Sequence, residues 1–162
     1  MSGSTGRFLH RCTREIGESD GVTEARISKE QAIRVAAEAA EAAGLPATAN
    51  LVERLDGQHD YFLVQFGAPG GRGAAVIVDA VDGSVMARAA VERLEQPWLM
   101  GEERAIEISG CKRPAEVRLV WKPSRATRSP FYPLWEISTA SGRVWVDQSG
   151  RLWRELTPAG PG

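Results

Sequence analysis

The chain has 162 residues, with 20 basic and 21 acidic side chains and a formal net charge of −1. Hydrophobic residues make up 43% and charged residues 25% of the chain. These proportions exclude a disordered protein, and the neutral total excludes a nucleic-acid binder that works by bulk positive charge. Two cysteines, Cys12 and Cys111, are too few for a disulfide scaffold.

The residues of the N-terminal region do not have the pattern of a targeting signal. The first twenty residues lack the apolar core of a secretory signal, and no segment approaches the roughly 20 apolar residues of a membrane-spanning helix. We therefore expect a cytoplasmic protein that does not bind membranes. Arginine outnumbers lysine 17 to 3, which is typical of a bacterium with a GC-rich genome.

The first half of the chain predicts one helix followed by four strands. Residues 1–24 lack sustained periodicity, and we interpret them as a flexible N-terminal arm. Ser28 and Gln31 have the spacing of a capping box, alanines then recur at helical spacing, and Gly44 and Pro46 end the pattern. After Pro46 the periodicity changes to two, and short turns predict an antiparallel meander of strands at 51–55, 61–66, 75–80 and 84–90.

The second half repeats this order. A helix is predicted at 101–109, followed by strands at 115–121, 133–139, 143–147 and 152–156. Because landmarks such as Val78-Asp79 and Val146-Asp147 recur in the same order, the pattern indicates a duplication. We expect an α+β fold of two tandem repeats, each one helix packed on a four-stranded antiparallel meander sheet. The expected boundaries are an arm at 1–24, repeats at 25–96 and 97–157, and a flexible tail at 158–162.

Both faces of the strand at 61–66 are apolar. Phe62, Val64 and Phe66 alternate with Tyr61 and Leu63, so side chains of both sets need cover. Each predicted repeat offers only one helix, which covers one face. We therefore expect the other face to pack against a second sheet or a second copy of the chain.

Three segments resemble the PepSY domain family. They are ISKEQAI at 27–33, YFLVQF at 61–66, and VIVDA at 76–80 with Gly83 and Val85. The resemblance covers residues 27–90 well and residues 101–156 more loosely, and the general build is also similar to β-lactamase inhibitory proteins and cystatin-like folds. It implies a non-catalytic module, because PepSY domains occur in protease propeptides and cell-envelope proteins, where they bind or inhibit proteins.

Residues suited to catalysis are few. His10 lies in the predicted arm, and His59 lies in a hairpin turn, where a general base would not be held against a substrate. No C-x-x-C or H-x-x-x-H spacing is present, so Cys12 and Cys111 form no metal-ligand set with the histidines. The glycine-rich segment 67–73 lacks the Lys-Ser/Thr of a phosphate-binding loop and indicates a hairpin. We expect no catalytic residue, metal or cofactor.

Two aspartates occupy equivalent places in the two halves. Asp79 and Asp147 each end a predicted strand shortly before a turn glycine. A carboxylate at that place can accept backbone N–H groups of the turn. We therefore expect both side chains to stabilise turns and not to act as a catalytic pair.

The second half carries the candidate binding surface. Residues 1–97 have a charge balance of −4, whereas residues 98–162 have +3 and hold all five tryptophans. Residues 112–128 include six basic side chains and one acidic side chain, Glu116, and aromatic residues follow directly in the sequence. A solvated loop beside a tryptophan-rich core would also produce this pattern. The candidate protein-binding residues are Arg118, Lys122, Arg125, Arg128, Phe131, Tyr132, Trp145 and Trp153.

The function we predict is non-catalytic protein binding, either inhibitory or regulatory, with a protein partner and with a homodimer as an alternative. Nucleic acid is not an expected partner. Two other hypotheses stay open. One is a small-ligand-binding protein with an apolar pocket between helix and sheet, and the other is an enzyme of unrecognised type.

Overall fold

A computed structural model describes residues 25–112 and 114–159. The arm predicted at 1–24 and the last residues of the predicted tail lie outside these ranges. The described chain forms two helices and eight strands. In chain order they are α1 (Lys29–Ala40), β1 (Ala47–Arg54), β2 (Tyr61–Phe66), β3 (Gly73–Asp79), β4 (Val85–Val91), α2 (Glu102–Ser109), β5 (Glu116–Trp121), β6 (Leu134–Thr139), β7 (Gly142–Val146) and β8 (Leu152–Trp153).

The strands form one continuous sheet. Its order is β4-β3-β2-β1-β5-β6-β7-β8, and neighbouring strands are antiparallel except β1 and β5, which are parallel. The prediction of two repeats with separate four-stranded sheets is therefore wrong, because the strands make one eight-stranded mixed sheet. The coarser prediction of an α+β protein rich in antiparallel sheet is confirmed.

The parallel pairing between β1 and β5, which joins the two halves of the sheet, is short. It consists of the register pairs Glu53–Val120 and Arg54–Trp121, continued by a 3.0 Å hydrogen bond from the N–H of Leu55 to the carbonyl of Trp121. Periodicity in a sequence reports which side of a strand is buried and not which strand lies beside it. This lateral pairing therefore could not be read from the pattern that indicated two units.

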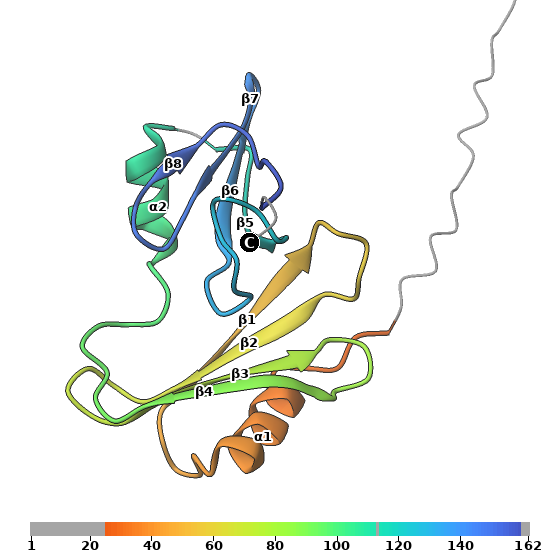
Figure 1. Cartoon of the computed structure of the whole chain (residues 1–162), viewed down its shortest axis with the longest axis vertical. Helices are drawn as coiled ribbons and strands as arrows, with labels where there is room; N and C mark the ends of the chain where they lie inside the picture. The colour runs from red at the N-terminus through yellow and green to blue at the C-terminus, as the bar shows by residue number, and fades with distance from the viewer. Residues whose placement is uncertain (1–24, 113, 160–162) are drawn as a thin grey trace, which may run out of the picture.

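Two cores lie on opposite faces of the first four strands. Ala32 and Ala36 of α1 are fully buried against Phe62, Val64 and their neighbours in β2 and β3. The other core joins Tyr61 and Leu63 to residues of α2, β5, β6 and β7. Figure 1 shows β1–β4 and β5–β8 turned steeply relative to each other, with α1 against the outer face of the first group. This face was expected to pack against a second sheet or a second copy of the chain, but it packs against the second half of the same sheet and α2.

The capping box that begins α1 is confirmed. The Oγ of Ser28 accepts the N–H of Gln31 at 3.1 Å, and the N–H of Ser28 donates to the Oε1 of Gln31 at 2.8 Å. The helix ends at Ala40, where Glu41 takes a left-handed conformation with φ 51°, earlier than Gly44 suggested. The small alanine face lets this helix lie close to β3.

Candidate functional site

Arg118 and Trp145 were predicted to bind a partner, and the structure places both against a buried carboxylate. Glu136 is 1% exposed. Its Oε1 accepts bonds from the Nε and Nη2 of Arg118 at 3.0 and 2.8 Å, and its Oε2 accepts from the Nε1 of Trp145 at 2.9 Å. The Nη1 of Arg118 reaches the Oε2 of Glu53 at 2.7 Å. Arg118 therefore joins the two halves of the sheet.

The charge of Arg118 is stabilised by this arrangement. Partial burial acts to lower the pKa of its guanidinium, but the hydrogen bonds and the negative charge of Glu136 outweigh burial and raise that pKa. Carboxylates of Glu53 and Glu116 act in the same direction. A buried carboxylate needs such a partner, since an unpaired buried charge is strongly unfavourable. Sequence reasoning missed this role because Glu136 lies on a strand face that periodicity assigns to polar residues.

Trp153 is also engaged within the chain. Its Nε1 donates to the Oδ2 of Asp147 at 2.8 Å, and the guanidinium of Arg151 lies 4.4 Å from the centre of its ring. Phe131 packs against the core that the two halves share, and Lys122 is partly buried at the end of β5. These three residues are therefore only partly exposed.

Asp79 and Asp147 both stabilise turns, as the sequence predicted. The Oδ1 of Asp79 accepts the N–H groups of Val81 and Asp82, and the Oδ1 of Asp147 accepts those of Ser149 and Arg151. Burial acts to raise the pKa of both carboxyls, but hydrogen bonds outweigh burial and lower each pKa. For Asp79 the main bonds are the two backbone N–H groups, and for Asp147 they are the side chains of Ser149 and Trp153 followed by the backbone N–H groups. His59 belongs to the first of these turns, since its Nδ1 lies 3.1 Å from the Oδ2 of Asp79.

Arg125, Arg128 and Tyr132 remain exposed on the loop at 122–133 between β5 and β6. Tyr132 is 47% exposed, and among the described residues its hydroxyl has no hydrogen-bond partner. The loop itself is tightly held. The Oγ1 of Thr127 donates to the carbonyl of Tyr132 at 2.7 Å, and the N–H of Ser124 donates to the carbonyl of Thr127 at 2.9 Å. Tyr132 is therefore presented by an ordered loop.

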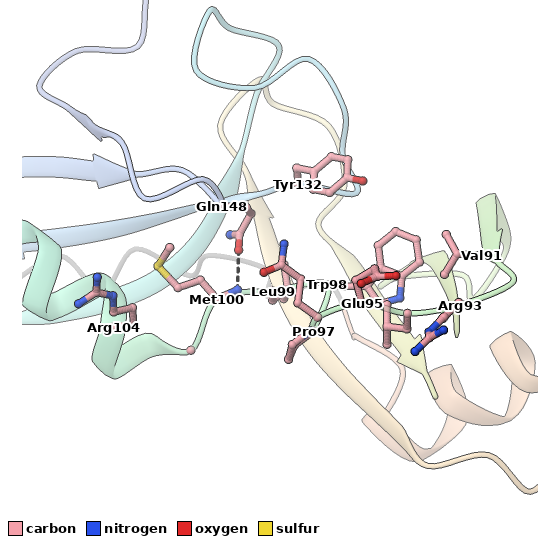
Figure 2. Close-up of a pocket in the computed structure, with 13 residues that line it drawn as sticks. Val91, Arg93, Glu95, Pro97, Trp98, Leu99, Met100, Arg104, Tyr132 and Gln148 are labelled. Carbon is pink, nitrogen blue, oxygen red and sulfur yellow. Dashed lines mark hydrogen bonds between the residues drawn. The ribbon is translucent and has the colours of Figure 1, made fainter. Parts of the chain in front are cut away.

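Two adjoining hollows meet at Tyr132. One has a volume of about 560 Å³ and is lined by the linker that joins β4 to α2, together with Arg104, Tyr132 and Gln148. The other, of about 480 Å³, is lined by Gln96, residues 126–129, Tyr132 and residues 147–149. Because the hollows share Gln96, Tyr132 and Gln148, we describe them together as the Tyr132 groove. In Figure 2 the linker crosses below Tyr132, with Gln148 and Arg104 towards one end and Val91 and Arg93 towards the other.

Gln148 fixes the wall of the Tyr132 groove. Its Oε1 accepts the N–H of Met100 at 2.7 Å, and its Nε2 donates to the carbonyl of Pro133 at 2.6 Å (Figure 2 shows the first of these bonds). The Nε1 of Trp135 also donates to the carbonyl of Met100, at 2.9 Å. The two bonds to Met100 tie the linker to the second half of the sheet, so the groove is a built feature and not a gap beside a loose segment.

Arginines dominate the charge of the Tyr132 groove. Arg93, Arg104 and Arg128 line it, opposed by Glu95 and Asp147. The carboxylate of Asp147 is already occupied by N–H groups of its turn and by Trp153. Arg104 likewise pairs with Glu107 on its own helix, so within this lining Arg93 and Arg128 face a single uncommitted acid, Glu95.

The linker is the part of the site that sequence reasoning missed. Gln96, Trp98 and Gln148 were not among the predicted binding residues. A segment without periodicity that carries a tryptophan between two periodic units is the signal that could have identified it. Tyr132 and Arg128 were predicted, and the structure brings them to one groove.

No family model matches the chain, and no curated protein matches it. A crystal structure of a Clostridium difficile 630 protein with the provisional description of a lipoprotein is similar at a TM-score of 0.37 and 15% identity, covering 80% of this chain and 91% of that chain. The PepSY resemblance stays a prediction. Among residues 25–112 and 114–159, no helix has the length and apolar character needed to cross a membrane.

Proposed function

We propose that this protein is a non-catalytic binding protein and that its Tyr132 groove takes up an acidic, extended segment of a partner protein. The observation that carries the proposal is the exposed ring of Tyr132 at the junction of two hollows, on a loop held by internal hydrogen bonds. A rigid loop loses little conformational entropy when it binds, so an exposed tyrosine on it can contribute fully to affinity.

The side chains around the groove suit a protein segment. Tyrosine and arginine are enriched among residues that dominate protein–protein binding energy. Arg93, Arg104 and Arg128 would attract acidic side chains, and the exposed hydroxyl of Tyr132 can bond to a peptide carbonyl or carboxylate. Nucleic acid fits less well, because single-stranded binding uses several exposed aromatic rings, and beside Tyr132 the groove lining holds only the partly buried ring of Trp98.

A selection experiment tests the proposal. A random peptide library is selected on the immobilised full chain, and enriched peptides are synthesised and measured by calorimetry at two salt concentrations. We expect enrichment of acidic peptides whose affinity falls as salt rises. Tyr132→Ala should weaken binding at least tenfold without changing the melting temperature, because the side chain is exposed.

A matched pair of charge reversals separates local from general electrostatics. Arg128→Glu changes the groove, whereas Arg154→Glu changes an exposed arginine just after β8 that lines neither hollow. We expect the first variant to lose at least tenfold in peptide affinity and the second less than twofold. Equal losses, enrichment of neutral peptides, or binding that survives Tyr132→Ala would contradict the proposal.

A small-ligand site is the second candidate, and one further hollow favours it. A space of about 290 Å³ lies between the end of α1 and β4, and alanines make up most of its lining, with Glu41 and Arg88 as its charged members. A thermal-shift screen of small apolar acids and amines tests this candidate. A ligand that raises the melting temperature of the chain but not of Ala74→Leu, which fills the hollow, would support it.

A further inference from the structure

The sheet ends in two strands of very different length. At one end β8 has only two residues, whereas at the other β4 has seven. Within the described residues, no strand pairs with the outer side of β4. Natural sheets usually protect such an edge with charges, proline or short strands, because unpaired backbone groups can pair with another chain.

The sequence of β4 offers little of that protection. It reads VMARAAV, with one charged residue and no proline, and its irregularity is confined to Met86, where the register with β3 shifts, so residues 87–91 form the regular part of the edge. Val85 is 42% exposed and Met86 is 47% exposed. The charged residue, Arg88, is turned towards α1, since its Nη1 donates to the carbonyl of Ala39 at 2.9 Å. The strand therefore combines an open hydrogen-bonding edge with exposed apolar side chains.

We propose that β4 pairs antiparallel with β4 of a second copy of this chain across a two-fold axis, so that two eight-stranded sheets join edge to edge. A second copy is the occupant that the strand itself specifies, because a seven-residue edge presents the same complementary edge to its own copy. In a closed two-fold dimer, the β4 edges of both copies pair with each other in a single contact.

Symmetry and charge select the register. In a two-fold antiparallel pair, side chains opposite one another lie on the same face, so one residue must lie opposite its own copy. A register centred on Arg88 would place two arginines directly opposite, which is unfavourable. A register centred on Ala89 avoids this, since Arg88 of the partner subunit then lies opposite Ala90.

The Ala89-centred register also brings Arg88 of the partner subunit close to a carboxylate of this chain. Ala90 and Glu41 line the same hollow of about 290 Å³ between α1 and β4. Arg88 of the partner subunit, lying opposite Ala90 on the face that carries α1, would therefore meet a carboxylate. On the other face the register sets Ala87, which packs on the shared core, opposite Val91 of the partner subunit. Apolar contact and charge pairing thus favour the same alignment.

The mass of the full chain in solution provides the first test. Sedimentation velocity over a hundredfold range of concentration should show a species of twice the 17.6 kDa chain mass. Ala90→Arg places two arginines opposite each other and should weaken the dimer at least tenfold. Adding Arg88→Glu to Ala90→Arg should restore the dimer. Ala140→Arg, an exposed change in the turn between β6 and β7, should leave it unchanged.

Cysteine crosslinking tests the register. In a chain with Cys12→Ser and Cys111→Ser, Ala89→Cys should form an intermolecular disulfide under mild oxidation, because directly opposite residues of an antiparallel pair have a suitable Cα separation. Ser141→Cys, exposed in the turn between β6 and β7, is the control and should not crosslink. A monomer at every concentration would overturn the proposal, and so would a dimer that ignores Ala90→Arg or crosslinks equally at both positions. None of these outcomes depends on peptide binding in the Tyr132 groove.

Discussion

The Oη of Tyr61 donates a 2.7 Å hydrogen bond to the carbonyl oxygen of Pro130. Tyr61 is fully buried on β2 in the first half of the sheet, and Pro130 lies in the loop that presents Tyr132. Burial raises the pKa of the Tyr61 phenol, so the hydroxyl stays protonated and remains a donor. The first half of the chain thus holds the loop that carries the candidate site of the second half.

Removing this hydroxyl should loosen the loop. Tyr61→Phe keeps the buried ring but leaves the carbonyl of Pro130 without its partner, which should lower the free energy of unfolding by about 1–3 kcal/mol. Urea denaturation measures that change, and hydrogen exchange should rise in residues 122–133. Tyr132→Phe is the control, since its hydroxyl has no partner among the described residues. Unchanged exchange in the loop would show that the bond does not hold it.

The buried carboxylate of Glu136 should matter more to stability than any exposed acid near it. Glu136→Gln removes one of the negative charges that Arg118 faces. Because Arg118 keeps its bond to Glu53 and is only partly buried, we expect a loss of about 1.5–3 kcal/mol, the range for a hydrogen bond to a charged group. The control is Glu116→Gln, whose carboxylate is mostly exposed and lies 3.9 Å from the Nη1 of the same arginine. We expect that control to cost less than about 1 kcal/mol. Similar losses in both variants, measured by urea denaturation, would refute this role for Glu136.

The elements of this fold were largely predictable because their signals are local. The capping box at Ser28 and the alternation in 61–66 each reflect interactions within a few residues. The single sheet was not predictable, because it depends on two register pairs between β1 and β5 and on Arg118 reaching Glu53 and Glu136. Such contacts join residues far apart in sequence, and neither periodicity nor turn chemistry encodes them.

The candidate site was likewise predictable only where its signals are local. Tyr132 and Arg128 follow from composition, since aromatic and basic residues gather in one loop. Alternation along β7 places Trp145 on the face opposite Val144 and Val146, but only the structure shows that it lies across from Trp153 and donates to Glu136. A tryptophan N–H and a buried carboxylate on adjacent strands satisfy each other, and parity alone cannot distinguish that arrangement from an exposed binding face.

Gly67 should tolerate a side chain less well than Gly57. Both have positive φ, of 103° and 79°, so a left-handed penalty of about 1–2 kcal/mol applies to alanine at either place. A Cβ on Gly67 would also approach the carbonyl oxygen of Arg72 far inside van der Waals contact, whereas one on Gly57 meets nothing within 4 Å. Gly67→Ala should therefore lower the melting temperature clearly more than Gly57→Ala. Equal losses in thermal unfolding would mean that the loop between β2 and β3 adjusts without cost.

Stability should fall in acid, with Asp147 among the groups responsible. Hydrogen bonds lower the pKa of its carboxyl in the folded chain below the ordinary value of 3.8, so the unfolded chain binds this proton more readily. The stabilising contribution is fully present above that ordinary value and is lost as pH falls through the lower folded pKa. Asp147→Asn should therefore be less stable than the natural chain at pH 7, and the difference should shrink below about pH 4. Urea midpoints at pH 7, 4 and 3 measure this.

Glu155→Gln is the control for the acid series, since Glu155 is exposed and forms no ion pair or side-chain hydrogen bond within the described residues. Its urea midpoints should run parallel to those of the natural chain at all three pH values. Because the amide oxygen introduced by Asp147→Asn would still accept some N–H groups of the turn, the loss at pH 7 should be partial, and the bond from Trp153 should weaken with it. A difference between Asp147→Asn and the natural chain that stays constant down to pH 3 would show that neutral hydrogen bonding, and not the charge, stabilises this turn.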